Sequence, residues 1–251
     1  MGRRLRLDAD MVRRGLVGSR GEAARAIEAN AVLVNGAMAD KSSRLVDPAD
    51  AVVLQQRPRF VSRGGEKLDA ALDAFAIDVA GMRALDAGAS TGGFTDCLLQ
   101  RGAAHVVALD VGHGQLHPKI RADPRVSVFE RFHIRDVTAD AIGGEVDLVV
   151  ADLSFISLVR VLSPLIAVCG PTGQLVLLVK PQFEAGRAEV DRGSGVIRDP
   201  AIHQRVCDEV SAALADRGCE VLGWIDSPIT GAEGNREFLV HARVCRSGSA
   251  P

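Results

Sequence analysis

Seven short apolar runs follow one another after residue 80, and segments with apolar residues at helical spacing separate most of them. This alternation predicts a mostly parallel sheet with helices on both faces, because a crossover must carry the chain back between parallel strands. The last two runs lie close together, which favours an antiparallel final strand. We therefore expect an α/β fold with strands over residues 83–86, 106–110, 126–129, 146–152, 174–180, 221–225 and 238–244.

The first sixty residues follow a different pattern. Apolar positions between residues 5 and 16 recur at near-helical spacing, and Asp8 or Asp10 is placed to cap that helix. Ser19 is placed to cap a second helix, with Glu22 three residues later as its capping-box partner. The pattern predicts two short helices at the start of the chain.

Strand and turn signals complete this small unit. Residues 31–34 and 52–54 are short apolar runs, and Asn35-Gly36 is the dipeptide of a tight hairpin turn. Residues 57–59, Arg-Pro-Arg, have the composition of a linker. We expect a small α+β domain over residues 1–59 and an α/β domain over residues 60–251.

Composition narrows the class of protein. The chain has 251 residues, of which 47% are hydrophobic and 25% charged, as in globular proteins with a full core. No apolar run approaches the roughly 20 residues needed to span a bilayer, and no signal core follows the basic N-terminus. The five cysteines are scattered without a Cys-x-x-Cys pair, which disfavours a zinc site and favours the cytoplasm.

Charge is distributed unevenly along the chain. Residues 1–67 contain 13 Lys and Arg against 8 Asp and Glu, and the remainder contains 17 against 24, so the net charges are +5 and −7. A basic front end on an acidic body suggests that the front end meets nucleic acid. A solvated surface with surplus arginine would have the same composition.

The candidate chemistry begins at residues 85–94, Leu-Asp-Ala-Gly-Ala-Ser-Thr-Gly-Gly-Phe, where an apolar run ends in a glycine-rich turn. The next apolar run ends in Asp110, which is placed to hold the ribose hydroxyls of a nucleoside. Ser90 stands where a dinucleotide fingerprint requires glycine, which favours S-adenosylmethionine because that cofactor has no pyrophosphate. The alternative is an ordinary glycine-rich turn.

Four charged residues lie at or near strand ends. Asp152 directly follows four apolar residues and Lys180 follows five. Lys67 lies at the start of the helix before the glycine turn, and Glu237 opens the last strand. Ligands of parallel sheets bind at the carboxyl ends of the strands, and a buried charge there is paired or functional. Residues 152–155 lack the prolines of enzymes that methylate exocyclic amines, which favours a hydroxyl as the target.

These positions resemble the FtsJ-type RNA 2′-O-methyltransferases, whose Lys-Asp-Lys-Glu tetrad surrounds a ribose 2′-hydroxyl. Residues 91–94, Thr-Gly-Gly-Phe, stand where that family has Pro-Gly-Gly-Trp. Residues 13–36 are similar to the small RNA-binding domain of S-four-type ribosomal proteins. Joined in this order, the two parts resemble the TlyA (hemolysin A) family of rRNA cytidine 2′-O-methyltransferases over nearly the whole chain.

The resemblance implies both a fold and a reaction. The fold is a Rossmann-like class I methyltransferase with a mostly parallel seven-stranded sheet, its last strand antiparallel, after a small α+β RNA-binding domain. The reaction is S-adenosylmethionine-dependent 2′-O-methylation of cytidine ribose in rRNA of the small subunit, the large subunit or both. The implied partners are ribosomal RNA or ribosomal subunits in the cytoplasm, with no metal and no membrane.

The resemblance also implies three groups of site residues. The catalytic group is Lys67, Asp152, Lys180 and Glu237, in which a neutral Lys180 accepts the proton of the 2′-hydroxyl. Asp136 either contacts the adenine edge or is an ordinary loop acid after His133. The expected cofactor-binding residues are Gly88, Ala89, Ser90, Gly92, Gly93, Phe94, Asp110, Asp136 and Asp152, and the expected RNA-binding residues are Arg3, Arg4, Arg6, Arg13, Arg14, Arg20 and Arg63.

Two other functions compete with this interpretation. One is a membrane-active hemolysin, as the family's second name suggests, and it is disfavoured because no amphipathic membrane helix is evident. The other is an RNA-binding ribosome-assembly factor without catalysis, which the intact tetrad disfavours. Residues 184–200 are rich in glycine and charge, and we expect a long polar loop that is either a lid ordered by RNA or a solvated crossover.

Overall fold

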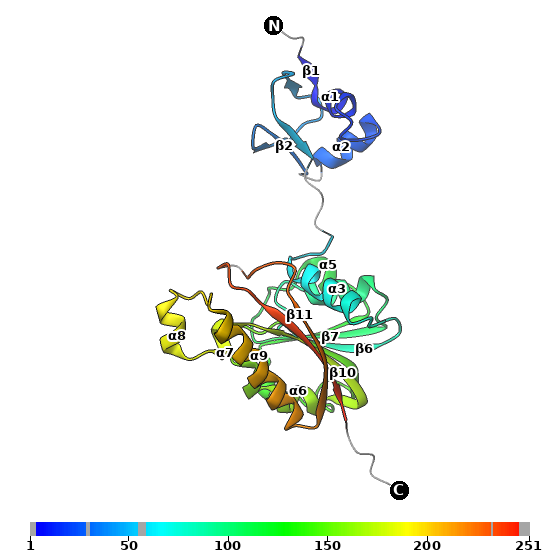
Figure 1. Ribbon diagram of the computed structural model, residues 1–251. Helices are drawn as coiled ribbons and strands as arrows, with labels where there is room; N and C mark the ends of the chain where they lie inside the picture. Colours follow the sequence, from blue (N-terminus) through cyan, green and yellow to red (C-terminus); the bar gives the residue numbers. More distant parts are fainter. Residues whose placement is uncertain (1–3, 29–30, 55–58, 232, 246–251) are drawn as a thin grey trace. The chain divides into compact units, whose positions relative to one another are not determined.

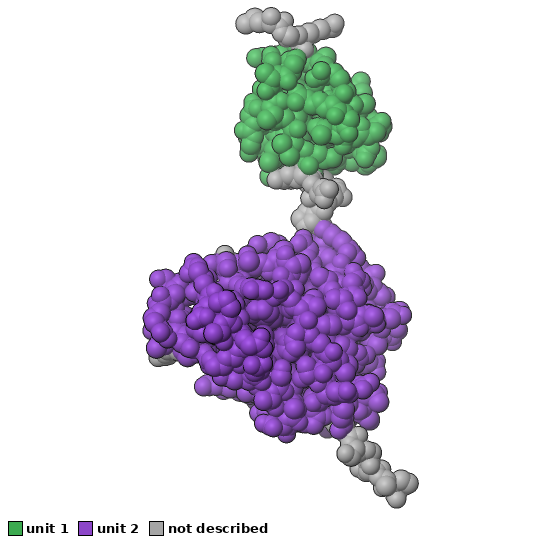
Figure 2. All heavy atoms as spheres, in the orientation of Figure 1, with its two compact units in different colours: residues 1–58 green, residues 59–251 purple. Residues whose placement is uncertain are grey.

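The computed structural model describes residues 4–28, 31–54, 59–231 and 233–245 (Figure 1). The chain divides into two compact units, Met1–Pro58 and Arg59–Pro251, called here the N-terminal and C-terminal units (Figure 2). Each unit has hydrophobic clusters of its own. No helix in the described part of the chain is long and apolar enough to cross a membrane.

The N-terminal unit packs two helices against short strands. Its core is formed by apolar side chains from both kinds of element, including Leu7, Met11, Ile27 and Val32. The hairpin of the central sheet turns at Asn35 and Gly36, which both have positive φ, as a tight two-residue turn requires. The elements are β1 (Leu5–Arg6), α1 (Leu7–Arg13), α2 (Arg20–Glu28), β2 (Val32–Val34), β3 (Ala37–Met38), β4 (Leu45–Val46) and β5 (Val52–Leu54), with β1 paired to β4 and a second sheet of order β3-β2-β5.

Helix capping in this unit differs in part from the prediction. The N-cap of α1 is Arg6, without a side-chain cap, and Asp8 and Asp10 lie inside the helix, so the prediction that one of them caps it was wrong. Both carboxylates are instead ion-paired to arginines, partners that a local capping rule does not consider. Ser19 does accept the Glu22 N–H, at 3.2 Å, as predicted for the second helix.

The C-terminal unit contains the predicted seven-stranded sheet. The strand order is β11-β12-β10-β9-β6-β7-β8, and β12 is antiparallel to both of its neighbours while the other ladders are parallel. The expected α/β fold with an antiparallel last strand is therefore confirmed. The strands are β6 (Arg83–Ala87), β7 (His105–Asp110), β8 (Val126–Glu130), β9 (Val146–Ala151), β10 (Cys169–Val179), β11 (Cys219–Asp226) and β12 (Phe238–Val244).

Helices cover both faces of this sheet and explain why its central strands are apolar throughout. Neighbouring residues of β9 point to opposite faces, so Val149 joins one cluster with α6 and α9, and Val150 joins another with α3 and α4. The helices are α3 (Gly64–Ala74), α4 (Gly93–Gln100), α5 (Pro118–Arg121), α6 (Leu162–Ala167), α7 (Pro181–Glu184), α8 (Arg187–Arg192) and α9 (Pro200–Ala215), with the 3-10 turns η1 (Ile134–Asp136) and η2 (Leu158–Arg160).

Residues 184–200 are more ordered than the expected polar loop, because they contain α8. Glu189 accepts the Gly186 N–H at the start of α8 and pairs with Arg205 of α9 at 2.6 Å. After α8, the buried Asn235 accepts the Ile197 N–H at 3.0 Å and donates to the Gly195 carbonyl at 2.9 Å. The expectation of a long polar loop was wrong for residues 187–192, which form a helix held by these distant partners.

Candidate active site

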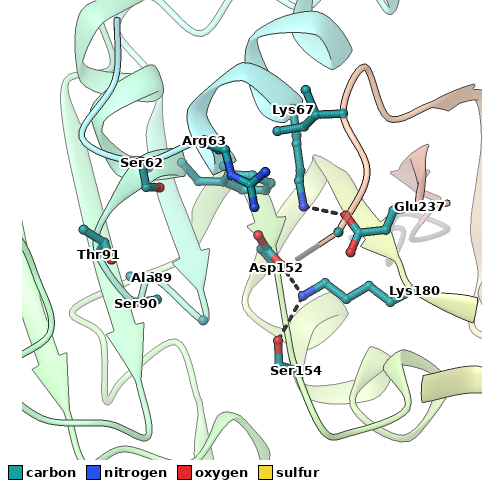
Figure 3. A pocket seen from close by; sticks show the side chains of 16 residues that line it. Ser62, Arg63, Lys67, Ala89, Ser90, Thr91, Asp152, Ser154, Lys180 and Glu237 are labelled. Carbon is teal, nitrogen blue, oxygen red and sulfur yellow. Dashed lines mark hydrogen bonds and ion pairs between the residues drawn. The ribbon is translucent and has the colours of Figure 1, made fainter. Parts of the chain in front are cut away.

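Two hollows adjoin at the carboxyl ends of the parallel strands. The first, called the lysine hollow, has a volume of about 510 Å³ and is lined by Lys67, Asp152, Lys180 and Glu237 among others (Figure 3). The second, called the Asp110 hollow, has a volume of about 460 Å³. Both hollows are lined by Gly88, Ser90, Asp152 and Ser154, so a group bound in one lies against a group bound in the other.

The sheet topology brings the predicted tetrad together. Asp152 follows β9 and Lys180 follows the neighbouring parallel strand β10, so both emerge at the same edge. Glu237 immediately precedes β12, which runs antiparallel to β10 and therefore starts at that edge. Lys67 reaches the same hollow from the first turns of α3.

The tetrad forms two ion pairs (Figure 3). Lys67 Nζ lies 2.5 Å from Glu237 Oε2, and Lys180 Nζ lies 2.6 Å from Asp152 Oδ1. The lysines are 8% and 9% exposed and Glu237 is 3% exposed, so each charge would be costly without its partner. Within each pair, the attraction between the opposite charges offsets part of the cost of burial.

The glycine turn between β6 and α4 packs tightly against the same elements. Gly88 has φ +84°, and a Cβ there would lie 2.7 Å from the Asp152 carbonyl oxygen. A Cβ on Gly93 would lie 2.1 Å from Ser62 Oγ and 2.9 Å from the Gly65 nitrogen. The sequence predicted Gly88 and Gly93 as cofactor-binding residues, and in the structure both also allow the turn to approach Asp152 and α3.

Asp110 is held in a fixed orientation at the end of β7. Its Oδ2 accepts the Ser90 N–H at 2.8 Å, and its Oδ1 accepts the Gly112 N–H at 2.6 Å. Ser90 has φ +47°, an unfavourable conformation for a residue with a side chain, and such strain concentrates at functional sites. The apolar walls of the Asp110 hollow come from Leu109, Phe132, Ile134, Leu153 and Ile156.

A fully buried carboxyl group, Asp86, lies in β6 two residues before Gly88. Burial raises the pKa of Asp86 to about 7, and the nearby charge of Asp152 contributes in the same direction. The Thr95 hydroxyl donates to its Oδ2 at 2.6 Å. Sequence reasoning did not single out Asp86, although an acid inside an apolar strand was a visible signal.

Some of the other sequence-predicted site residues line a hollow, and others do not. Arg63 and most residues of the glycine turn line the lysine hollow, and Arg63 points into it beside Lys67 (Figure 3). Asp136 ends η1 and lines neither hollow, whereas its neighbours His133 and Ile134 line the Asp110 hollow. Sequence reasoning missed Ser62, Ser154, Ile229 and Gly231, which line the lysine hollow without forming a recognisable motif.

The predicted RNA-binding arginines of the N-terminal unit are organised by two buried carboxylates. Asp8 pairs with Arg6 and Arg20, and these two arginines lower the pKa of Asp8 to about 2. Asp10 pairs in the same way with Arg13 and Arg14. Each cluster carries a surplus positive charge at the surface of the unit.

The remaining predicted RNA-binding arginines differ in their exposure to solvent. Arg14 also donates to the carbonyl oxygens of Asp47, Pro48 and Asp50, and its side chain is 23% exposed. Arg4 is exposed, and Arg3 lies outside the described residues. Among the described residues, no group of three or more His, Cys, Asp or Glu is placed to hold a metal ion.

The sheet order, the glycine turn and the acid at the end of β7 define the C-terminal unit as a Rossmann-like methyltransferase. A methyltransferase from Listeria monocytogenes described as S-adenosylmethionine-dependent shares this fold at a TM-score of 0.54 and 16% identity, covering 73% of this chain and 99% of that chain. Residues 60–244 match the FtsJ-like methyltransferase family, and residues 5–52 match the S4 domain. The chain belongs to the FtsJ-like methyltransferase family and carries an S4 domain, as the sequence predicted.

Closer relatives place the chain in the TlyA group of that family. The chain is 51% identical over 246 residues to the 16S/23S rRNA (cytidine-2′-O)-methyltransferase TlyA of Mycobacterium tuberculosis, covering 97% of this chain and 91% of the relative. It is 39% identical to hemolysin A of Brachyspira hyodysenteriae, covering 94% and 99%. A solved structure from Streptococcus thermophilus, also called a hemolysin, matches with a TM-score of 0.74 and 41% identity, covering 97% and 90%.

Proposed function

We propose that this protein transfers a methyl group from S-adenosylmethionine to the ribose 2′-hydroxyl of a cytidine in ribosomal RNA. The observation that carries the proposal is the pair of adjoining hollows with Asp152 between them. One hollow suits a nucleoside cofactor, and the other holds two lysines and two carboxylates around the space for a target ribose. We take cytidine as the target nucleoside and ribosomal RNA as the substrate from the name of the relative in Mycobacterium tuberculosis.

The Asp110 hollow fits the nucleoside part of the cofactor. Asp110 is fixed by two backbone N–H groups and can accept hydrogen bonds from both ribose hydroxyls. The apolar walls suit a flat base, and Gly88 and Ser90 extend towards the lysine hollow. When bound, the cofactor supplies an electrophilic methyl group on a sulfonium.

The lysine hollow supports deprotonation of the target hydroxyl. As the 2′-oxygen forms its bond to the methyl carbon, the carbon–sulfur bond breaks and the hydroxyl proton passes to Lys180 Nζ in its neutral form. Asp152 lies 2.6 Å from that nitrogen, and the Lys67–Glu237 pair lines the same hollow (Figure 3). Orientation of the hydroxyl towards the methyl group supplies a further part of the rate.

RNA binding in this proposal depends on phosphate contacts. Arg6, Arg13 and Arg20 each keep a partly exposed guanidinium beside a buried carboxylate, and Arg63 reaches into the lysine hollow itself. Such contacts position RNA without reading its sequence. The proposed partners are ribosomal subunits in the cytoplasm.

The test is to incubate the purified protein with radiolabelled S-adenosylmethionine and each ribosomal subunit, and then to map the label. We expect label on a cytidine 2′-oxygen with the wild-type protein, and turnover lower by roughly 10²–10⁴-fold with Lys180→Ala. Label on a base, or no label on either subunit, would contradict the proposal. Dye release from liposomes by the same preparation would favour the membrane-active alternative.

A further inference from the structure

Ser154 lies where the two hollows meet. It lines both of them, two residues after Asp152, and its hydroxyl oxygen accepts a hydrogen bond from Lys180 Nζ at 3.0 Å (Figure 3). It belongs to no motif in the sequence and is not one of the four tetrad residues. Its hydroxyl nevertheless contacts the nitrogen that accepts the proton in the proposed function.

Lys180 Nζ has two polar neighbours in the lysine hollow. Asp152 Oδ1 lies 2.6 Å from the nitrogen as an ion-pair partner, and Ser154 Oγ accepts a hydrogen bond from it at 3.0 Å (Figure 3). The nitrogen carries three substituents beyond its carbon stem, either three protons or two protons and a lone pair. One of these positions is directed at Ser154, Asp152 lies beside the nitrogen, and the Lys180 side chain lines the lysine hollow.

We propose that Ser154 is a positioning residue that aims the lone pair of neutral Lys180 at the target hydroxyl. This inference rests on the proposed function. In the neutral lysine, one N–H donates to Ser154, Asp152 stays beside the nitrogen, and the lone pair accepts the proton of the 2′-hydroxyl. After transfer, the ammonium keeps its hydrogen bond to Ser154 and its ion pair with Asp152, and its new N–H faces the methylated oxygen.

The segment that carries Ser154 is held to the element that carries Lys180. Glu184, at the end of α7, accepts the Ser157 hydroxyl at 2.7 Å and the Leu158 N–H at 2.6 Å. Lys180 is the N-cap of the same helix. Phe155, directly after Ser154, has φ +64°, a conformation that persists only when the surrounding structure enforces it. The two ends of the Lys180–Ser154 hydrogen bond are therefore fixed relative to each other.

A lysine held by Asp152 alone would be less well directed. Its four-carbon stem has many rotamers, and a single carboxylate contact leaves the nitrogen free to turn about that contact. The second acceptor removes that freedom before the substrate binds. Such preorganisation affects the chemical step more than RNA binding, because the hydrogen bond between Lys180 and Ser154 is already present without RNA.

The first test compares Ser154→Ala with Ser154→Thr in the subunit methylation assay. For Ser154→Ala we expect kcat to fall roughly 10–100-fold, the range for a hydrogen bond to a charged group, with KM for the subunit changed less than about threefold. Ser154→Thr keeps the hydroxyl and should restore most of the activity. Ser163→Ala, on the exposed face of α6 outside both hollows, is the matched control and should match the wild type.

The second test repeats Ser154→Ala in a Lys180→Ala background, with single-turnover rates as the readout. A positioning residue has nothing left to position there, so we expect no further loss. An equal loss in both backgrounds, or a normal kcat for Ser154→Ala while Lys180→Ala is impaired, would overturn the inference and leave the proposed function intact. Absence of ribose methylation by the wild-type protein would overturn both.

Discussion

Asp86 shows how the environment of a single residue sets its charge. The carboxyl group is fully buried, Thr95 donates to one oxygen, and within the described residues the other oxygen has no hydrogen-bond partner. Ionisation in this position is opposed by burial, and the negative charges of Asp152 and Asp110 oppose it further. The protonation state of Asp86 is therefore coupled to folding.

The sign of this coupling gives a prediction. The folded-state pKa of about 7 lies above the unfolded value, so the folded chain binds more protons between about pH 4 and 7 and loses stability as pH rises through that range. Asp86→Asn cannot titrate, so we expect the stability of the wild type relative to this variant to fall by roughly 1–3 kcal/mol between pH 5 and 8. Urea unfolding followed by the fluorescence of Trp224, the single tryptophan, reports on the C-terminal unit. A pH-independent difference between the two proteins would refute the coupling.

Asp110 carries a prediction about the cofactor. Replacement by alanine removes the acceptor for the ribose hydroxyls and also releases the Ser90 N–H that holds the turn. We expect Asp110→Ala to weaken S-adenosylmethionine binding by roughly 1.5–3 kcal/mol, as for the loss of charge-assisted hydrogen bonds. Calorimetric titration measures this directly, with Asp136→Ala as a comparison because Asp136 lines neither hollow. Unchanged affinity in Asp110→Ala would remove Asp110 from the site.

At the scale of elements, the contact between the starts of α3 and α4 shapes the site. A Cβ on Gly93 would meet Ser62 Oγ and the Gly65 nitrogen, so Gly93→Ala must push the two helices apart. We expect a loss of roughly 1–3 kcal/mol in unfolding free energy together with weaker cofactor binding. Gly170→Ala is the control, because its nearest neighbour would lie at an ordinary 3.5 Å. Equal stability of the two variants in urea would show that the contact relaxes without cost.

The strands were predictable from sequence because each central strand is buried on both faces and therefore apolar along its length. The start of β10 was not. It begins at Cys169, where the prediction began at residue 174, because residues 170–173 read as a turn. Cys169 nevertheless pairs with Val146, and the register shifts before Gln174. Irregular pairing of this kind depends on the neighbouring strand and leaves no local pattern.

The tetrad was predictable as a group, but its internal pairing was not. Charges at the carboxyl ends of parallel strands must converge, which is why Asp152 and Lys180 could be placed together. That Lys67 pairs with Glu237 depends on where α3 and β12 meet in space, 170 residues apart along the chain. Ser154 could not be found at all, since its role depends on the direction of one lysine nitrogen.

At the scale of the whole molecule, the basic residues and the two hollows are distributed unequally between the two units. The N-terminal unit contains 10 Lys and Arg against 7 Asp and Glu, while the hollows lie entirely in the C-terminal unit. We expect residues 59–251 alone to fold and bind the cofactor but to lose methylation of ribosomal subunits. Subunit binding by the full chain should weaken steeply with salt, because phosphate contacts release counterions. Full activity of the shortened protein would show that the S4 domain is dispensable.

The position of β12 has a consequence for the life of the chain during its synthesis. Among the described strands β12 is the last along the chain, yet it lies inside the sheet, between β10 and β11. Until residues 237–244 have left the ribosome, β10 has no partner on that side and Lys67 has no Glu237 to pair with. A nascent chain that has not yet released β12 therefore lacks both an interior strand of the sheet and one member of the proposed catalytic group.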